Sequence, residues 1–375
     1  SIIFYGIILI KKRYFLHMNE FIILQTVTPS YRNNFFDYLS STLKDDFHLY
    51  SGDYYFEKSV ISDLTYSRRK KITNFFFLNR MFLFQFGMWS IIFRKNILVL
   101  EMNPRIISNW IILIIRKILN RKTVLWGHAW PRAGKNSYSD KIRHFMRLLG
   151  STILVYTKTQ QKELQVKMPN KNISFASNSL YRVNEMKTNY SDSPINNMIY
   201  VGRLTRSKKP LLFIKSFHKI YDKLPNNIKL FVVGDGPEKQ EILKYIKQNN
   251  LHSSIEIFGH IDDYETLRKL YFSSLFSISP GYIGLSVTQS FGFGVPMIVS
   301  EHENHSPEIE AVKEGENAIY FQTDNEESLC EKMYQMYEYR DKWINKRNNI
   351  VKDCQTNYSI EAMSLPFIEI YNQNQ

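Results

Sequence analysis

Residues 200–217 read YVGRLTRSKKPLLFIKSF, and this stretch decides the fold prediction. The apolar run up to Gly202 predicts a buried strand, and the periodic apolar run from Pro210 predicts a helix, because proline is favoured in a helix's first turn. The loop between them carries Arg203 and Lys208. Arginine offers a planar fork to a diphosphate and lysine a point charge. Taken alone, the loop fits a diphosphate cradle and a solvated basic loop equally well.

Two later stretches repeat the strand–loop–helix plan. Residues 230–246, LFVVGDGPEKQEILKYI, place Gly234 in the turn after a buried strand. Residues 278–300, ISPGYIGLSVTQSFGFGVPMIVS, carry Gly284 in a loop that enters a helix, and free N–H groups at a helix start favour an anion. Ligands of open α/β sheets bind at the carboxyl ends of the strands. The three loops therefore predict one phosphate-binding crevice.

Short apolar strands alternate with helical patterns along the whole chain, which predicts two doubly wound α/β domains with parallel sheets. The polar, turn-rich segment 187–197 is the predicted linker. We expect an N-terminal Rossmann-like domain at 18–186, a C-terminal one at 198–356, and a final helix at 357–375 that crosses back to the first domain. Residues 1–17 are expected to be a disordered or artefactual extension.

The composition excludes several classes of protein. Hydrophobic residues make up 44%, enough for a buried core, and two cysteines exclude a disulfide scaffold and a cysteine-based zinc site. The net charge of +14 predicts an acidic partner, which could be nucleic acid, anionic lipid or a phosphorylated small molecule. Nucleic acid is not expected, because no zinc-finger spacing or RNP-like strand is present. The sequence contains no run of 18 apolar residues, so no membrane-spanning helix is predicted.

Two basic and aromatic segments favour a membrane surface as partner. In residues 66–95, the cations Arg68 to Lys71 precede a predicted helix rich in Phe, Met and Trp. In residues 105–122, an apolar run precedes four further cations. An aromatic face with basic flanks suits the headgroup region of an anionic bilayer. A packed helix with solvated ends explains either segment alone, but the two together favour an anionic membrane surface.

Four motifs of residues 198–321, in this order, resemble the C-terminal domain of the GT-B glycosyltransferases, specifically glycosyltransferase family 4 (the group 1 glycosyltransferases). The resemblance implies two Rossmann-like domains that face each other across a cleft. The motifs are Gly202-Arg203-Leu204 with Lys208, Val233-Gly234-Asp235-Gly236-Pro237, Phe258-Gly259, and Gly294-Val295-Pro296.

The resemblance implies a UDP-, GDP- or ADP-sugar donor in the C-terminal domain. Arg203 and Lys208 would hold the diphosphate and stabilise its departure, so we expect neither a metal nor another cofactor. The other donor-binding residues implied are Gly202, Gly234, Phe258, Gly259, His260, Gly284, Leu285, Ser286, Gln289 and Glu308.

The sequence departs from the family at two positions. The family's two glutamates, separated by seven residues, correspond to Gly281 and Gln289. Gln289 can still hydrogen-bond ribose hydroxyls, whereas Gly281 offers no side chain. We expect Tyr282, Ser286 or Glu308 to substitute for it.

The acceptor side is predicted in the N-terminal domain, in loops after two strands. Tyr31 and Arg32 follow the first strand, and His128 follows the strand at 123–127. A lone histidine is more often structural, but this one ends a buried strand, and in family 4 such a histidine often lies near the transferred sugar. His128 is therefore a predicted catalytic residue. The further acceptor-side candidates are Trp126, Trp130 and Arg132, with Lys135 as a second cation.

The leading functional prediction is a bacterial glycosyltransferase of the hexosyltransferase type, acting on a glycan or polyprenyl-linked acceptor in capsule or lipopolysaccharide biosynthesis. The resemblance implies retention of configuration, independence of metals, and a cytoplasmic enzyme peripheral to the inner face of the cell membrane. A sugar-nucleotide 2-epimerase of the same fold and an inactive sugar-nucleotide-binding subunit are alternatives. A nucleic-acid-binding protein is supported by charge alone.

Overall fold

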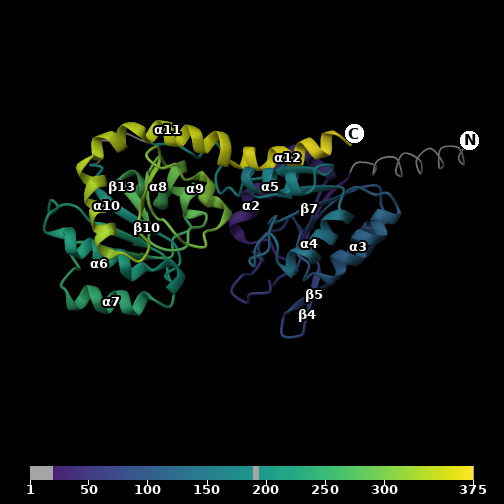
Figure 1. The fold of residues 1–375 in the computed structure, drawn as a ribbon, viewed down its shortest axis with the longest axis horizontal. Helices are drawn as coiled ribbons and strands as arrows, with labels where there is room; N and C mark the ends of the chain where they lie inside the picture. The colour runs from purple at the N-terminus through teal and green to yellow at the C-terminus, as the bar shows by residue number, and fades with distance from the viewer. Residues whose placement is uncertain (1–19, 189–193, 375) are drawn as a thin grey trace, which may run out of the picture. The chain divides into compact units, whose positions relative to one another are not determined.

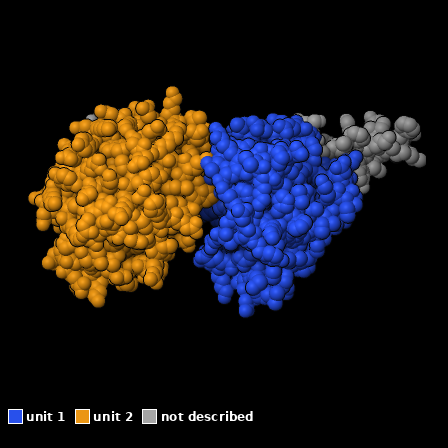
Figure 2. All heavy atoms as spheres, in the orientation of Figure 1, with its two compact units in different colours: residues 1–177, 360–375 blue, residues 178–359 orange. Residues whose placement is uncertain are grey.

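The chain forms two compact units in a computed structural model that describes residues 20–188 and 194–374 (Figure 1). The first unit runs to residue 177 and resumes at 360, and the second comprises 178–359 (Figure 2). The expected extension at 1–17 and residues 189–193 of the expected linker lie outside the described residues.

The first unit is built on a seven-stranded sheet in the order β3-β2-β1-β6-β7-β8-β9, and every pair is parallel. The central strands are buried on both faces, which explains their nearly continuous apolar sequences. The strands are β1 (Phe21–Gln25), β2 (Phe47–Ser51), β3 (Arg69–Lys71), β6 (Ile97–Glu101), β7 (Thr123–Trp126), β8 (Thr152–Val155) and β9 (Asn172–Phe175).

Helices cover both faces of this sheet. One face packs on α2 and α12, and the other on α3, α4 and α5. The helices are α2 (Asn33–Leu43), α3 (Ile107–Ile118), α4 (Tyr138–Leu149), α5 (Lys158–Lys167) and α12 (Ile360–Asn372), with short 3₁₀ turns at Ser30–Arg32, Lys44–Asp46 and Trp89–Ile91.

The second unit has a six-stranded parallel sheet in the order β12-β11-β10-β13-β14-β15. Its strands are β10 (Asn197–Val201), β11 (Leu230–Val233), β12 (Ile255–Gly259), β13 (Ser274–Ser279), β14 (Met297–Ser300) and β15 (Ala318–Phe321). One face packs on α6 (Pro210–Tyr221), α7 (Lys239–Gln248) and α10 (Glu326–Glu338), and the other on α8 (Tyr264–Phe272), α9 (Ser286–Gly292) and α11 (Arg340–Tyr358). Further 3₁₀ turns lie at Arg206–Lys208 and Pro307–Ala311. The prediction of two doubly wound domains is confirmed.

The predicted aromatic helix within residues 66–95 is wrong. The segment forms an antiparallel hairpin of β4 (Thr73–Phe77) and β5 (Phe82–Phe86), labelled in Figure 1. The inward positions are Asn74, Phe76, Leu83 and Gln85, so the side chains alternate with period two. Consecutive phenylalanines obscure that alternation in the sequence, because both faces of the hairpin are apolar.

The boundary between the units also differs from the expected one. Residues 178–186 belong to the second unit, where Tyr181 and Met186 pack in the core with Phe291 and Phe293. The segment has no regular apolar period, so only tertiary packing assigns it. The last helix, α12, begins at Ile360, after an extended Ser359, and packs on α2.

Candidate functional site

Three loops of the second unit meet closely at the carboxyl ends of β10, β11 and β13. A Cβ atom at Gly234 would lie 1.9 Å from the carbonyl oxygen of Gly202, and one at Gly281 would lie 2.4 Å from that of Ser207. The N–H of Tyr282 donates to the Ser207 carbonyl at 2.8 Å. Glycine is required where backbones come this close. The three loops therefore form one continuous cradle, which we call the glycine cradle.

Lys208 lies over the glycine cradle. Its Nζ donates to the carbonyl of Tyr282 at 2.6 Å and lies 4.7 Å from the centroid of that tyrosine ring. A Cβ atom at Gly284 would be 3.7 Å from this nitrogen. Burial, reinforced by the nearby charge of Arg203, lowers the pKa of Lys208 to about 8. Two cations this close repel each other, and a bound anion would relieve that repulsion.

Glu308 borders the same site from the 3₁₀ turn Pro307–Ala311. Its carboxylate accepts from Asn178 Nδ2 at 2.7 Å and also from the Ser306 hydroxyl. Its charge opposes the fall in the pKa of Lys208, which places the two groups within electrostatic reach. Of the candidates for the missing side chain at Gly281, Glu308 is a carboxylate already held in a fixed orientation.

His305 holds the loop of the glycine cradle, and the sequence did not point to it. The N–H of Ile283 donates to His305 Nδ1 at 3.1 Å, and His305 Nε2 donates to the Ser300 carbonyl at 2.9 Å. This pattern fits a neutral ring, and burial lowers the pKa of His305 accordingly. No motif marks this residue, because its role depends on a loop 22 residues away.

Gln289 is partnered at both ends of its amide. Nε2 donates to the Tyr181 hydroxyl at 2.9 Å, and Oε1 accepts from the Tyr271 hydroxyl at 3.3 Å. One N–H and one lone pair remain, so the ribose contact stays a prediction. Ser286 opens α9, which has only seven residues. The predicted anion contact at Gly284 and Leu285 therefore depends on backbone N–H groups rather than on a long helix.

The predicted base-binding residues follow the end of β12. The Phe258 ring packs edge-on against Phe231 with a centroid separation of 5.4 Å and is partly exposed. The Gly259 carbonyl accepts from Gly234 N–H at 2.7 Å, which ties this strand end to the glycine cradle. His260 is exposed beside them. The base contact itself stays a prediction.

In the first unit, Arg32 organises the predicted acceptor side. Its guanidinium lies 4.7 Å from the centroid of the Trp126 ring and donates hydrogen bonds to Tyr31 and Tyr156. Burial lowers the pKa of Arg32, but the two phenols outweigh burial and hold the pKa above its ordinary value. Trp126 is only 2% exposed and packs in the core, so it supports Arg32 instead of facing a ligand as expected.

Glu101 is a second residue to which the sequence did not point. It ends β6, and its carboxylate accepts from the backbone N–H of Thr26 and, at 3.0 Å, from the Thr26 hydroxyl. Burial raises the pKa of Glu101, against the opposing influence of Thr26 and Arg32. The carboxyl-end rule that selected Arg32 also applies to Glu101. This edge of the sheet therefore carries both a carboxylate and a guanidinium.

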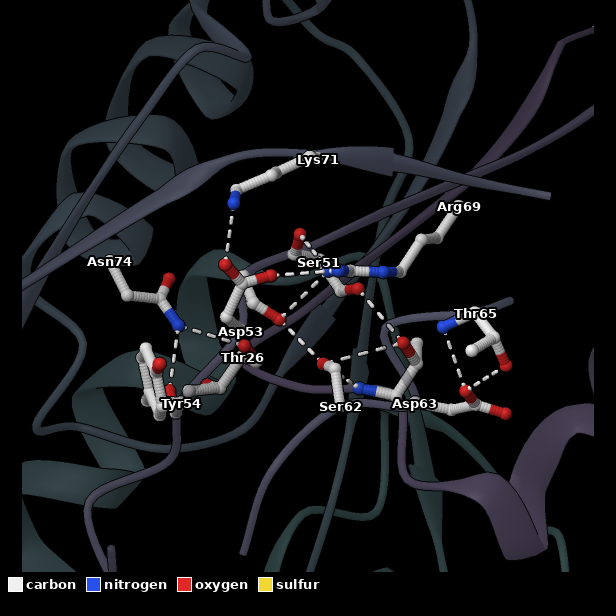
Figure 3. Close-up of polar contacts among 12 residues, drawn as sticks. Thr26, Ser51, Asp53, Tyr54, Ser62, Asp63, Thr65, Arg69, Lys71 and Asn74 are labelled. Carbon is white, nitrogen blue, oxygen red and sulfur yellow. Dashed lines mark hydrogen bonds and ion pairs between the residues drawn. The ribbon is translucent and has the colours of Figure 1, made fainter. Parts of the chain in front are cut away.

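A polar network fixes the loops around Thr26, the residue that also binds Glu101 (Figure 3). The Thr26 carbonyl accepts from Asn74 Nδ2 at 2.8 Å, and Asn74 also donates to the Tyr54 carbonyl at 2.9 Å (Figure 3). Asp53 binds Arg69 at 2.7 Å and Lys71 at 2.6 Å. Arg69 and Lys71, which were expected to face a membrane, therefore pair with a carboxylate of their own unit. Arg68 likewise pairs with Asp37 at 2.9 Å.

The remaining acceptor-side candidates separate into two groups. His128 is exposed, and its ring meets that of Tyr156 edge-on with a centroid separation of 4.7 Å, so it adjoins the Arg32 cluster. Trp130 Nε1 donates to Glu163 at 2.7 Å, and Lys135 pairs with the same carboxylate. Trp130 and Lys135 thus brace α5, whereas Arg132 is exposed on the loop.

Metal-ligating side chains do not gather in groups of three or more among residues 20–188 and 194–374. Among the charges beside the glycine cradle, those of Arg203 and Glu308 act on Lys208, and Asp235 in the turn between Gly234 and Gly236 pairs with Lys239 at 2.7 Å.

Residues 184–355 match the family model described as glycosyl transferases group 1. This part of the chain is a group 1 glycosyltransferase domain. Two curated relatives come from Campylobacter jejuni. One, N-acetylgalactosamine-N,N'-diacetylbacillosaminyl-diphospho-undecaprenol 4-alpha-N-acetylgalactosaminyltransferase, is 25% identical over 38% of this chain and 37% of its own length. The other, GalNAc-alpha-(1->4)-GalNAc-alpha-(1->3)-diNAcBac-PP-undecaprenol alpha-1,4-N-acetyl-D-galactosaminyltransferase, is 23% identical over 60% of each chain. This chain therefore spans less than two thirds of the length of either relative.

Solved structures establish the fold over nearly the whole chain. Anabaena HepE in complex with UDP aligns with a TM-score of 0.69 and 12% identity, over 95% of this chain and 100% of its own. Sucrose-phosphate synthase from Thermosynechococcus elongatus aligns with a TM-score of 0.64 and 14% identity, over 94% and 98%. The group 1 domain thus belongs to a chain with the GT-B glycosyltransferase fold.

Proposed function

We propose that the protein is a glycosyltransferase that moves a sugar from a nucleoside-diphosphate donor to a hydroxyl of a lipid-linked glycan in bacterial cell-surface polysaccharide biosynthesis. The observation that carries this proposal is the pair Arg203 and Lys208 beside the glycine cradle, within a group 1 glycosyltransferase domain. Anionic diphosphate oxygens fit the two cations, and the backbone of the cradle allows close approach.

Arg203 and Lys208 stabilise the negative charge that develops as the diphosphate leaves. Lys208 is partly deprotonated near pH 8 in the free protein, and a bound diphosphate would hold it in the charged state. We propose a metal-independent reaction, because these cations supply charge where a metal would. The retaining outcome is part of the proposal, on the family resemblance.

UDP-sugars are the proposed donors, since the similar HepE structure is a complex with UDP. The proposed acceptor is polyprenyl-linked, because both Campylobacter relatives are named for undecaprenol-linked substrates. We propose a position on the inner face of the cell membrane for the same reason. On the acceptor side, Arg32, Glu101 and His128 supply hydrogen-bonding groups for sugar hydroxyls.

One observation favours a second candidate, an inactive sugar-nucleotide-binding subunit. Gly281 takes the place of a family glutamate, and a Cβ atom there would lie 2.4 Å from the Ser207 carbonyl. The site therefore excludes that glutamate sterically. If the protein is an active enzyme, another polar group must replace the missing glutamate. We propose Glu308 for this role, because Asn178 holds its carboxylate in place.

Isothermal titration with UDP, GDP and ADP, followed by an assay for transfer from the matching sugar nucleotide to an undecaprenyl-diphosphate-linked glycan, tests both candidates. We expect UDP to bind and its sugar to be transferred. Nucleotide binding without transfer or donor hydrolysis would support the inactive subunit. A failure of all three nucleotides to bind would contradict both. Product formation from the donor alone, with its sugar epimerised, would identify the 2-epimerase.

A further inference from the structure

The hairpin of β4 and β5 presents an aromatic face to solvent. Leu83 and Gln85 point inward and are buried. The register pairs the outward positions across the two strands, and no outward phenylalanine is buried. These residues are Phe75, Phe77, Phe82, Phe84 and Phe86, of which Phe75 is 57% and Phe86 47% exposed. A two-stranded hairpin with five phenylalanines on its outer face leaves a contiguous apolar surface of the kind that marks an interaction site.

Helices α3 and α4, beside the hairpin, also carry exposed apolar side chains. Leu83 of β5 bridges to Ile106 at the start of α3, and α3 packs against α4 (Figure 1). The inner sides of both helices are buried, yet their outer stripes are also apolar, with Ile118 77% and Phe145 65% exposed. The outer stripes consist of Ile111, Ile114 and Ile118 on α3, and Ile142, Phe145 and Leu148 on α4. We call the hairpin face and these two stripes the apolar platform.

Positive charge is concentrated in the same part of the chain. Residues 64–139 contain fourteen lysines and arginines and a single acidic residue, Glu101. Five of these cations pair with acidic residues outside this range and Arg116 is fully buried, so the charge available to a partner comes from the remaining exposed cations. Lys117 and Lys141 are exposed within α3 and α4, and Lys122 is exposed just after α3. The apolar platform is therefore flanked by exposed cations.

We propose that the apolar platform docks on the headgroup region of an anionic phospholipid bilayer. Apolar and aromatic side chains bury at the boundary between headgroups and acyl chains, and lysines beside them attract anionic headgroups. A second copy of the chain fits less well, because it would bring two strongly positive surfaces together. None of the helices in residues 20–188 and 194–374 is long and apolar enough to span a bilayer. The docking proposal stands independently of the proposed catalytic function.

Sedimentation with vesicles tests the docking, using phosphatidylglycerol mixed with phosphatidylcholine and, separately, phosphatidylcholine alone. Three variants are compared: Phe75→Ser/Phe86→Ser, Ile118→Ser/Phe145→Ser, and Lys117→Gln/Lys122→Gln/Lys141→Gln. All seven side chains are exposed, so the variants should fold. The lysine variant should weaken binding to anionic vesicles by about a hundredfold, since each of the three lysines near such a surface contributes about a fivefold factor. Each apolar variant should weaken it by about tenfold or more.

Matched controls lie in the second unit. Tyr339→Ser/Leu243→Ser and Lys223→Gln/Lys342→Gln/Lys352→Gln remove exposed side chains of the same kinds and should bind vesicles like the wild type. Equal binding to neutral and anionic vesicles, or unchanged binding in the three platform variants, would overturn the proposal. So would a dimer in solution that the apolar variants dissociate, with no vesicle binding. UDP titration of the same preparations separates a failure of docking from a failure of the proposed function.

Discussion

Lys208 loses its proton at a lower pH than an ordinary lysine, because its pKa is lowered. Burial lowers its pKa from 10.5 to about 8, so the side chain loses its proton as the pH rises through 8. Diphosphate binding requires the charged form. We expect UDP affinity measured by calorimetry to be about tenfold weaker at pH 9 than at pH 7, the neutral-to-charged ratio one unit above the pKa. Lys208→Arg should remove most of this pH dependence, because arginine stays charged. A flat wild-type profile would exclude Lys208 from the diphosphate site.

Glu101 should affect the acceptor and not the donor. Its carboxylate is oriented by Thr26 and lies within electrostatic reach of Arg32, so it can accept a hydrogen bond from a sugar hydroxyl. Glu101→Gln keeps the shape but loses the charge, and we expect kcat/KM for the acceptor to fall about tenfold or more, the usual loss for a charge-assisted hydrogen bond. UDP affinity should stay unchanged. Glu57→Gln, on an exposed loop of the same unit, is the control. A stability loss with normal turnover per folded molecule would assign Glu101 a purely structural role.

Local motifs could identify some site residues from sequence and not others. Arg203 and Lys208 stand in a strand–loop–helix stretch that predicts an anion site only together with the two later stretches and the family resemblance. His305 and Glu101 have partners 22 and 75 residues away, and only the folded chain brings those partners together. Trp126 was predicted to face the acceptor because it stands at the end of a strand. In the structure its ring instead packs in the core against Phe35 and Phe367.

At the scale of elements, the hairpin shows why an apolar run is ambiguous. Residues 75–86 are apolar or aromatic at most positions, which suits a buried helix as well as a hairpin with two apolar faces. Only the inward pair Asn74 and Gln85 marks the period of two, because Gln85 Nε2 donates to Asn74 Oδ1 at 3.1 Å. The alternation of strands and helices elsewhere was predictable because the strands are short and separated by turn residues.

Asn74 should contribute measurably to the stability of the first unit. Its amide donates to the Thr26 and Tyr54 carbonyls, and thereby holds the hairpin against the end of β1 (Figure 3). Asn74→Ala leaves two carbonyls without this donor and should lower the free energy of unfolding by about 1–3 kcal/mol. Thr73→Ala, exposed on the neighbouring position, should change it by about 0.5 kcal/mol or less. Urea unfolding followed by circular dichroism gives both values, and equal effects in the two variants would contradict the bracing role.

At the scale of the molecule, α12 belongs to the same unit as β1, although more than 330 residues separate the two elements in the sequence. Phe367 of α12 is fully buried and packs on Phe35 and Trp126, with ring centroids 5.3 and 5.0 Å apart. Phe367→Ala should lower the free energy of unfolding by about 3–5 kcal/mol, whereas Leu365→Ala, half exposed on the same helix, should cost about 1 kcal/mol or less. Thermal unfolding should assign the loss to the first unit, while UDP binding in the second unit persists. Loss of UDP binding in folded Phe367→Ala would contradict this division.

The overall plan was predictable because each strand and helix carries its own periodic signal, whereas the boundary between the units was not. Residues 178–186 join the second unit through two side chains, Tyr181 and Met186, in an otherwise irregular segment. A pair of isolated apolar residues gives no periodicity in sequence. Such a segment can be assigned to one of the two units only when the core against which its side chains pack is known.

The most direct test of the donor site is calorimetric titration of UDP into the wild type, Arg203→Ala, Lys208→Ala and the control Arg206→Ala, an exposed cation of the same loop. We predict that Arg203→Ala and Lys208→Ala each weaken UDP binding by at least about tenfold, since a charge-assisted contact contributes roughly 1.5–3 kcal/mol. Arg206→Ala should bind UDP like the wild type. Unchanged affinity in both Arg203→Ala and Lys208→Ala, with intact melting temperatures, would contradict the donor site and the glycosyltransferase mechanism built on it.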